Sequence, residues 1–183
     1  MELEDEVLVS RSQHGDTAAF ECLVRRYQPR IQRFLENQIS NSEDAKDMTQ
    51  QTFIKAYSSL SRFRNGRHFS PWIFTIARRQ SIDYLRVKGA AKNDSSRYGV
   101  EHLETDDDPG KLLASAEHCQ QIWKWVRSLV DQRSYHVLWL KVQEGMQVKE
   151  ISEVVGISQS NVKVLLCRAR KTLVAHKIHQ EEI

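Results

Sequence analysis

Short polar side chains and basic side chains follow one another near the C-terminal end of the sequence. From residue 159 to 177 the segment contains lysines and arginines but no acidic residue. Amides and hydroxyls can pair with base edges, and basic groups can neutralise phosphates. The predicted contacts to duplex DNA are Gln159, Ser160, Asn161, Lys163, Arg168 and Lys171. An ordinary helical hairpin with a solvated basic face is the alternative interpretation.

A second basic segment, residues 62–92, has aromatic side chains interleaved with its charges. It contains eight lysines and arginines but a single acid, Asp83, and it includes Asn65 and His68. Such a surface suits single-stranded nucleic acid, because bases stack on aromatic rings and phosphates need counter-charge. We expect Trp72 and Phe74 to belong to a helix core, which leaves Phe63, His68 and Phe69 as better candidates for base contact.

The elements that position these segments are predicted to be helices. Seven glycines and three prolines among 183 residues provide few turns, which argues against a many-stranded fold. Apolar residues recur at helical spacing. In the first half we expect a helix at 5–14 and a longer one after Asp16, which Pro29 should kink or break. A third helix should begin at Ser42, and a fourth, capped by Ser70, should end near Val87. In the second half we expect helices at 112–130, 133–144, 148–155 and 158–176.

The last two of these helices have helix-turn-helix spacing. Residues 148–155 form a short helix that stops at Gly156, and Ser158 is placed to cap the longer helix that follows. In this motif the second helix enters the major groove of DNA.

Periodicity vanishes between the two halves, where acidic residues cluster at 101–108. This stretch is too long for a loop inside a compact domain. The expected fold is therefore all-α, with a first domain at 1–87, an acidic flexible linker at 88–110 and a helix-turn-helix domain at 111–183. The net charge of +3 conceals two basic surfaces, one on each domain.

Other protein classes are excluded by simple features. The longest apolar run is four residues, and the N-terminus is acidic, so neither a membrane span nor a signal peptide is expected. Cys22, Cys119 and Cys167 are far apart, which supports no disulfide framework and no metal site. Without a membrane span or a signal peptide, we expect a cytoplasmic protein. Neither a catalytic cluster nor a phosphate-binding glycine motif is found, so we expect a protein that is not an enzyme and needs no cofactor.

Two sets of motifs resemble the sigma factors of bacterial RNA polymerase. Residues 47–57, 69–79 and 83–86 look like region 2 of that family, and residues 150–158 and 162–170 resemble region 4. The size and order are similar to the extracytoplasmic-function (ECF) group. The chain departs from the family pattern at Gln51, where an acid is frequent, and at Val164 and Leu165, where a small polar and a basic residue are frequent.

This resemblance implies partners for particular residues. Region 2 of the family docks on the clamp helices of the polymerase largest subunit, which would involve Asp47, Gln50 and Gln51. It also opens and reads the minus-10 promoter element, and region 4 reads the minus-35 element through the six polar and basic residues given above. The implied minus-10 contacts are Arg62, Asn65, His68, Arg78, Arg79 and Arg86.

The function expected from the resemblance is promoter recognition and transcription initiation with core RNA polymerase at a specific regulon. An anti-sigma factor would restrain it, and the protein would join the nucleoid when active. A stand-alone helix-turn-helix regulator is the main alternative, and an adaptor that binds polymerase without DNA is a third. The acidic linker would either enter the basic channels of the polymerase or serve as a solvated tether.

Overall fold

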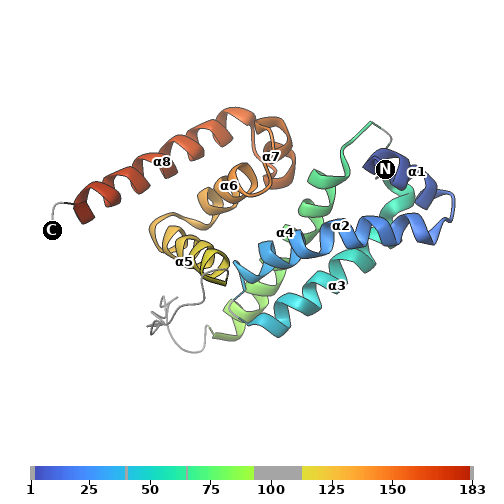
Figure 1. Ribbon diagram of the computed structural model, residues 1–183, viewed down its shortest axis with the longest axis horizontal. Helices are drawn as coiled ribbons and strands as arrows, with labels where there is room; N and C mark the ends of the chain where they lie inside the picture. Colours follow the sequence, from blue (N-terminus) through green and yellow to red (C-terminus); the bar gives the residue numbers. More distant parts are fainter. Residues whose placement is uncertain (1–2, 40, 65, 93–112, 182–183) are drawn as a thin grey trace.

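The computed structural model describes residues 3–39, 41–64, 66–92 and 113–181, and these residues form helices and no strands (Figure 1). The predicted all-α class is thereby confirmed. Most of the segment predicted to be an acidic linker, together with Asn65, lies outside the described residues. The elements are α1 (Asp5–Gln13), α2 (Thr17–Glu36), α3 (Ser42–Ser59), the 3-10 turn η1 (Leu60–Arg62), α4 (Phe69–Lys92), α5 (Leu113–Leu129), α6 (Gln132–Val142), α7 (Val148–Val155) and α8 (Gln159–Glu181).

Helices α1 to α4 form the N-terminal domain. The side chain of Asp16 caps α2 by accepting a hydrogen bond from the backbone N–H of Ala19, and Asn41 caps α3 in the same way. The core contains large side chains with almost no exposure, such as Ile31, Phe34 and Phe74. The rings of Phe34 and Phe74 meet edge to face with their centroids 5.3 Å apart, which ties α2 to α4.

Of the two outcomes expected at Pro29, a kink or a break, the break does not occur, and two expectations for α4 were wrong. Helix α2 is not broken at Pro29 but continues to Glu36. Pro29 lies on the exposed side of α2, so the carbonyl that it leaves unbonded can face water while the buried side holds the helix. Helix α4 begins at Phe69, which places Ser70 inside the first turn and not at the cap, and it runs to Lys92 and not to Val87.

Helices α5 to α8 form the C-terminal domain. Trp123 and Trp139 pack at 4.7 Å between ring centroids, and Tyr135 completes this aromatic cluster between α5 and α6. Val162 and Ala169 bury one side of α8 against the rest of the domain. Val137 and Leu140 on α6 complete the core of this domain and have no exposed surface.

The two domains are in contact. Figure 1 shows α7 beside α4. The Arg30 guanidinium on α2 forms an ion pair at 2.6 Å with Glu144, whose side chain is 4% exposed. Arg127 donates hydrogen bonds to the backbone carbonyls of Asn37 and Gln38 just after α2. We call this contact the interdomain interface.

A buried polar chain runs through the interdomain interface. The side-chain oxygen of Gln38 accepts hydrogen bonds from the Ser81 hydroxyl on α4 at 2.8 Å and from the His136 ring on α6 at 2.7 Å. Its amide nitrogen donates to the carbonyl of Phe34, so both ends of the Gln38 amide are satisfied. Such a network holds only when every member is paired, which makes it specific to this docking.

Candidate nucleic-acid interface

The turn between α7 and α8 has the geometry of a helix-turn-helix. Gly156 ends α7 in the left-handed conformation, with φ at 71° and ψ at 38°, which a residue with a Cβ adopts only under strain. The Ser158 hydroxyl then accepts a hydrogen bond from the backbone N–H of Asn161 at 3.3 Å, which confirms Ser158 as the predicted cap. Glu150 and Gln147 close a capping box at the start of α7.

The exposed surface of α8 carries the predicted duplex contacts. All six of the residues predicted from the sequence are exposed, namely Gln159, Ser160, Asn161, Lys163, Arg168 and Lys171. Arg168 and Lys171 also line a hollow with Leu129, Val130, Asp131 and Ser134 at the junction of α5 and α6. Leu165 packs partly against the core, whereas Val164 is 46% exposed and takes no part in the packing. The structure therefore brings the polar and basic side chains to one open surface that also includes Val164.

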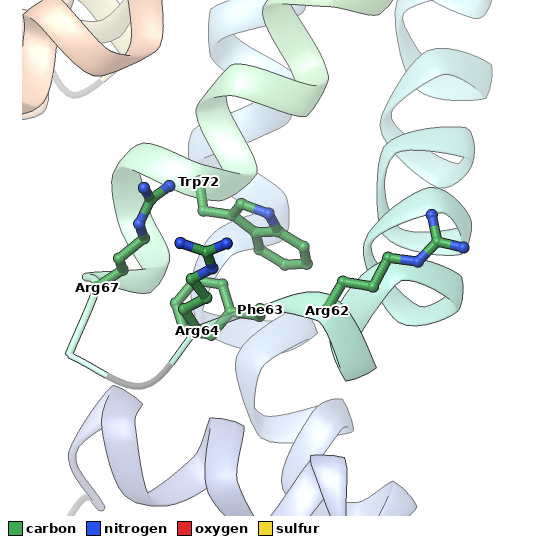
Figure 2. Close-up of a pocket in the computed structure, with 5 residues that line it drawn as sticks. All are labelled: Arg62, Phe63, Arg64, Arg67 and Trp72. Atoms are coloured by element: carbon green, nitrogen blue, oxygen red, sulfur yellow. The ribbon is translucent and has the colours of Figure 1, made fainter.

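A hollow of about 320 Å³ lies in the basic loop between α3 and α4 (Figure 2). It is lined by Arg62, Phe63, Arg64, Arg67 and Trp72. Arg64 and Arg67 lie on one side of the Trp72 indole, and Arg62 extends away on the other. Positive charge around one partly open aromatic face provides both a stacking platform and phosphate contacts.

The aromatic residues of this loop are distributed differently from the sequence-based expectation. Phe69 is buried away from the hollow and is not a candidate for base contact, whereas Phe63 lines the hollow but is largely buried behind Trp72. The Phe63 ring lies edge-on to Trp72 at 5.0 Å between centroids, so it supports the indole from below the surface. Arg64, Arg67 and Trp72 were missed as site residues, although the basic composition of residues 62–68 pointed to this loop.

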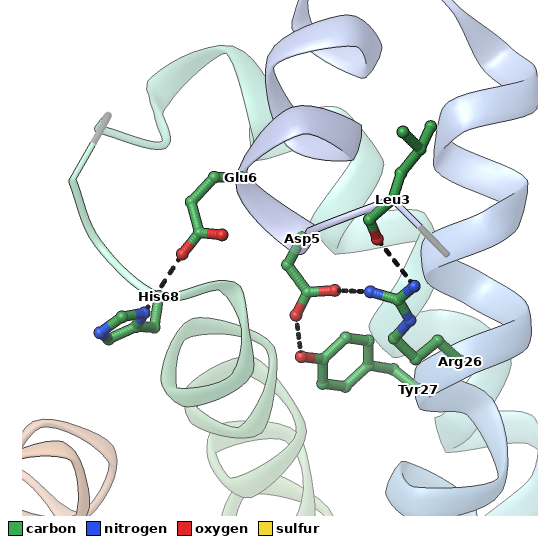
Figure 3. A network of polar contacts seen from close by, with 6 residues as sticks. All are labelled: Leu3, Asp5, Glu6, Arg26, Tyr27 and His68. Atoms are coloured by element: carbon green, nitrogen blue, oxygen red, sulfur yellow. Dashed lines mark hydrogen bonds and ion pairs between the residues drawn. The ribbon is translucent and has the colours of Figure 1, made fainter. Parts of the chain in front are cut away.

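Helix α1 anchors the same loop. Gln13 donates hydrogen bonds to the backbone carbonyls of Leu60 at 2.9 Å and Phe63 at 2.8 Å, and Glu6 lies 3.3 Å from the ring of His68 (Figure 3). Asp5 contacts both Arg26 and Tyr27, which fastens α1 to α2. The hollow is therefore held by the N-terminal helix and not by the loop alone.

The other predicted minus-10 contacts on α4 fall into two groups. Arg79 and Arg86 are exposed, and Arg86 pairs with Asp83 at 3.2 Å. Arg78 is half-buried at the interdomain interface, where its Nε finds no hydrogen-bond partner among the described residues. Burial, followed by the nearby charges of Arg133 and Arg79, lowers the pKa of the Arg78 guanidinium. Docking of the C-terminal domain therefore brings Arg78 and Arg133 into repulsion.

Helix α3 presents a separate polar face. Asp47, Gln50 and Gln51 are exposed, and the buried side of the helix contains Met48, Thr52 and Phe53. Ile54 and Tyr57 extend the exposed side with apolar surface, at 67% and 49% exposure. A helix face that mixes one acid, two amides and two apolar groups suits a protein partner better than nucleic acid.

Comparisons with known proteins agree with this arrangement. The model of the sigma-70 region 2 family matches residues 23–90, and that of sigma-70 region 4 matches residues 133–173. The ECF RNA polymerase sigma-E factor of Haemophilus influenzae is 30% identical over 185 residues, which cover 97% of this chain and 96% of the relative. The factor of the same name from Escherichia coli K12 is 29% identical and covers 94% and 93% of the two chains.

Solved structures share the fold at lower identity. CnrH, in complex with the cytosolic domain of CnrY, superposes with a TM-score of 0.72 at 23% identity and covers 96% of this chain and 97% of its own. The sigma factor RpoE of Bartonella quintana, in complex with the anti-sigma factor NepR, has a TM-score of 0.67 at 21% identity and covers 84% and 93%.

A helical domain with a basic hollow and a helix-turn-helix domain, matched in order by regions 2 and 4, define the sigma-70 class of transcription initiation factors. More narrowly, the chain belongs to the ECF sigma factors of bacterial RNA polymerase. A stand-alone helix-turn-helix regulator is thereby set aside. No helix in the described part of the chain is long and apolar enough to cross a membrane.

Proposed function

We propose that each domain of this sigma factor reads one promoter element. Residues 1–87 contact core polymerase and the minus-10 element, residues 111–183 bind the minus-35 element, and residues 88–110 tether the two. The observation that carries the proposal is the pair of separate basic surfaces, the hollow beside Trp72 and the outward face of α8. The minus-10 contacts include Arg62, Asn65, His68, Arg79 and Arg86, with Arg78 available once the domains part.

The hollow suits a base that has left the duplex. Flipping a base out requires a few kcal/mol of unstacking, which stacking on Trp72 and phosphate contacts from Arg64 and Arg67 can offset. The protein acts by binding and positioning, without an enzymatic step of its own, in the cytoplasm and on the nucleoid. An anti-sigma factor is a further proposed partner, because the Bartonella RpoE shares the fold and was solved in complex with the anti-sigma factor NepR.

Run-off transcription on genomic fragments tests the proposal. The purified chain is expected to give transcripts with defined start sites only when core polymerase is added. Core polymerase alone and the chain alone are the controls. Tight binding to duplex promoter fragments by the chain alone, without any association with core polymerase, would contradict the proposal.

Reversing the charge of Asp47 should weaken binding to core polymerase. In the Asp47→Arg variant a basic group replaces the single acid among the three predicted contacts of α3. Loss of a rim charge contact corresponds to about 1 kcal/mol or more, so we expect at least a fivefold rise in Kd, measured by fluorescence anisotropy with labelled sigma factor. Glu21→Arg, a reversal of another exposed acid on α2, is the matched control. Equal affinities for the two variants would remove Asp47 from the interface.

A further inference from the structure

The outward face of α8 contains two valines among polar and charged side chains, Val164 near the start of the helix and Val174, 53% exposed, nearer its end. At 100° per residue, Ser160, Val164, Cys167 and Lys171 form one stripe opposite the buried Val162 and Ala169. Val164 stands in the second turn of this stripe and is 46% exposed. The side chain therefore points away from the core, although packing is the usual role of valine.

The surroundings of Val164 indicate what covers it. Lys163 and Arg168 flank it along the helix, and no acidic residue occurs between 159 and 177. A basic rim of this kind neutralises phosphates on both sides of a groove. In a helix-turn-helix, the early turns of the second helix lie closest to the base edges. Val164 is thus placed at the bases, while the lysine and arginine beside it are placed at the backbone.

The chemistry of the major groove then restricts what Val164 can read. Guanine, cytosine and adenine present donors and acceptors there, which a valine side chain would leave unpaired. Thymine alone among the four presents an apolar group, its C5-methyl. A valine pressed against a polar base edge would displace water without replacing its hydrogen bonds.

We propose that Val164 is a specificity-determining residue that selects thymine in the upstream promoter element by packing against its C5-methyl group. The inference rests on the proposed function, in which α8 binds this element. It goes further by assigning one base, thymine, to one side chain. Ser160, one turn earlier on the same stripe, is free to pair with a neighbouring base or phosphate.

The test uses the complete chain bound to core polymerase. A promoter library with a randomised upstream element is selected for initiation, and each thymine of the selected element is then replaced singly by deoxyuridine, which lacks only the methyl group. With the wild-type protein, one replacement should lower initiation about fourfold, the factor that corresponds to burying one methyl group. With Val164→Ala, whose shorter side chain buries less of the methyl group, the same replacement should have a clearly smaller effect.

Lys163→Ala provides the matched control. It removes a charge next to Val164, so it should weaken initiation on all promoters and reduce the salt dependence, while the loss caused by deoxyuridine persists. If no thymine is selected, or if deoxyuridine lowers initiation equally for wild type and Val164→Ala, the inference is wrong. If no promoter-specific initiation occurs with core polymerase at all, the proposed function itself fails, and the two failures are distinct.

Discussion

Alanine in place of Arg30 is expected to release the C-terminal domain from the N-terminal domain. The Glu144 carboxylate is 4% exposed and has its charge balanced by Arg30 at 2.6 Å. Removing one partner of a buried ion pair leaves a charge without compensation. Breaking a buried ion pair usually destabilises a structure by about 3–5 kcal/mol. Because the Arg30 side chain is itself 29% exposed, we take the lower end and expect the free energy of domain docking to become about 3 kcal/mol less favourable. Undocking avoids this penalty by returning Glu144 to water.

The natural cysteines provide the measurement. Cys22 on α2 and Cys167 on α8 are free and exposed, so each can be labelled with a dye. Cys119 is also exposed and is replaced by serine, which leaves one labelled cysteine on each domain. Energy transfer between the dyes should fall in Arg30→Ala. Arg33→Ala, which removes an exposed charge whose side chain bonds to the Pro29 carbonyl within α2, should leave the energy transfer unchanged.

Two further variants separate docking from folding. Arg30 also lies over the Tyr27 ring at 4.8 Å, so its loss affects the N-terminal domain as well. Glu144→Ala spares that contact and should cause a smaller loss of energy transfer. Methionine at both positions should restore docking, because an apolar pair can replace a buried ion pair. Undiminished energy transfer in Arg30→Ala would show that the ion pair does not hold the domains together.

Acid is expected to open the interdomain interface through His136. The side chain is 1% exposed, and burial together with the nearby Arg78 and Arg127 lowers its pKa to about 3, with Asp131 opposing. In the undocked form, where water replaces Gln38 and Phe34, the pKa returns toward its usual 6.5.

The sign of the pH effect follows from proton uptake. Between pH 6.5 and about 3 the undocked form binds a proton that the docked form does not, so docking is strongest above pH 6.5 and weakens as the pH falls. At pH 5 the loss amounts to about 2 kcal/mol. The same dye pair should therefore report domain separation between pH 7.5 and pH 5.

His136→Gln is the matched control, since its amide can still donate to Gln38 but does not titrate in this range. Its energy transfer should be independent of pH between 7.5 and 5, whatever its level at neutral pH. His14 and His68 are exposed and remain in both proteins. An equal response to acid in His136→Gln would assign the pH dependence to other groups.

Sequence reasoning succeeded where the signals are local. The end of α7 and the cap of α8 were predicted correctly because Gly156 and Ser158 mark the turn between them by their own backbone preferences. It failed where tertiary packing decides. Phe63, Phe69 and Trp72 are equally aromatic in the sequence, and only the fold determines that the first two are buried while the third is partly exposed at the hollow. Gln38 and His136, which meet at 2.7 Å, are 98 positions apart, so no periodicity could predict the interdomain interface.

The docked arrangement also sets an energetic threshold for initiation. On the proposed function, the two promoter elements lie about 25 base pairs apart, which is about 85 Å of duplex. Two domains in contact within a chain of this size, with an expected radius of gyration of about 16 Å, cannot reach both elements at once. The contacts of Arg30, Arg127 and His136 must therefore break on the promoter. Each 1.4 kcal/mol of docking strength lowers the apparent promoter affinity about tenfold. A variant whose two domains dock more tightly would thus bind promoters more weakly and initiate less transcription.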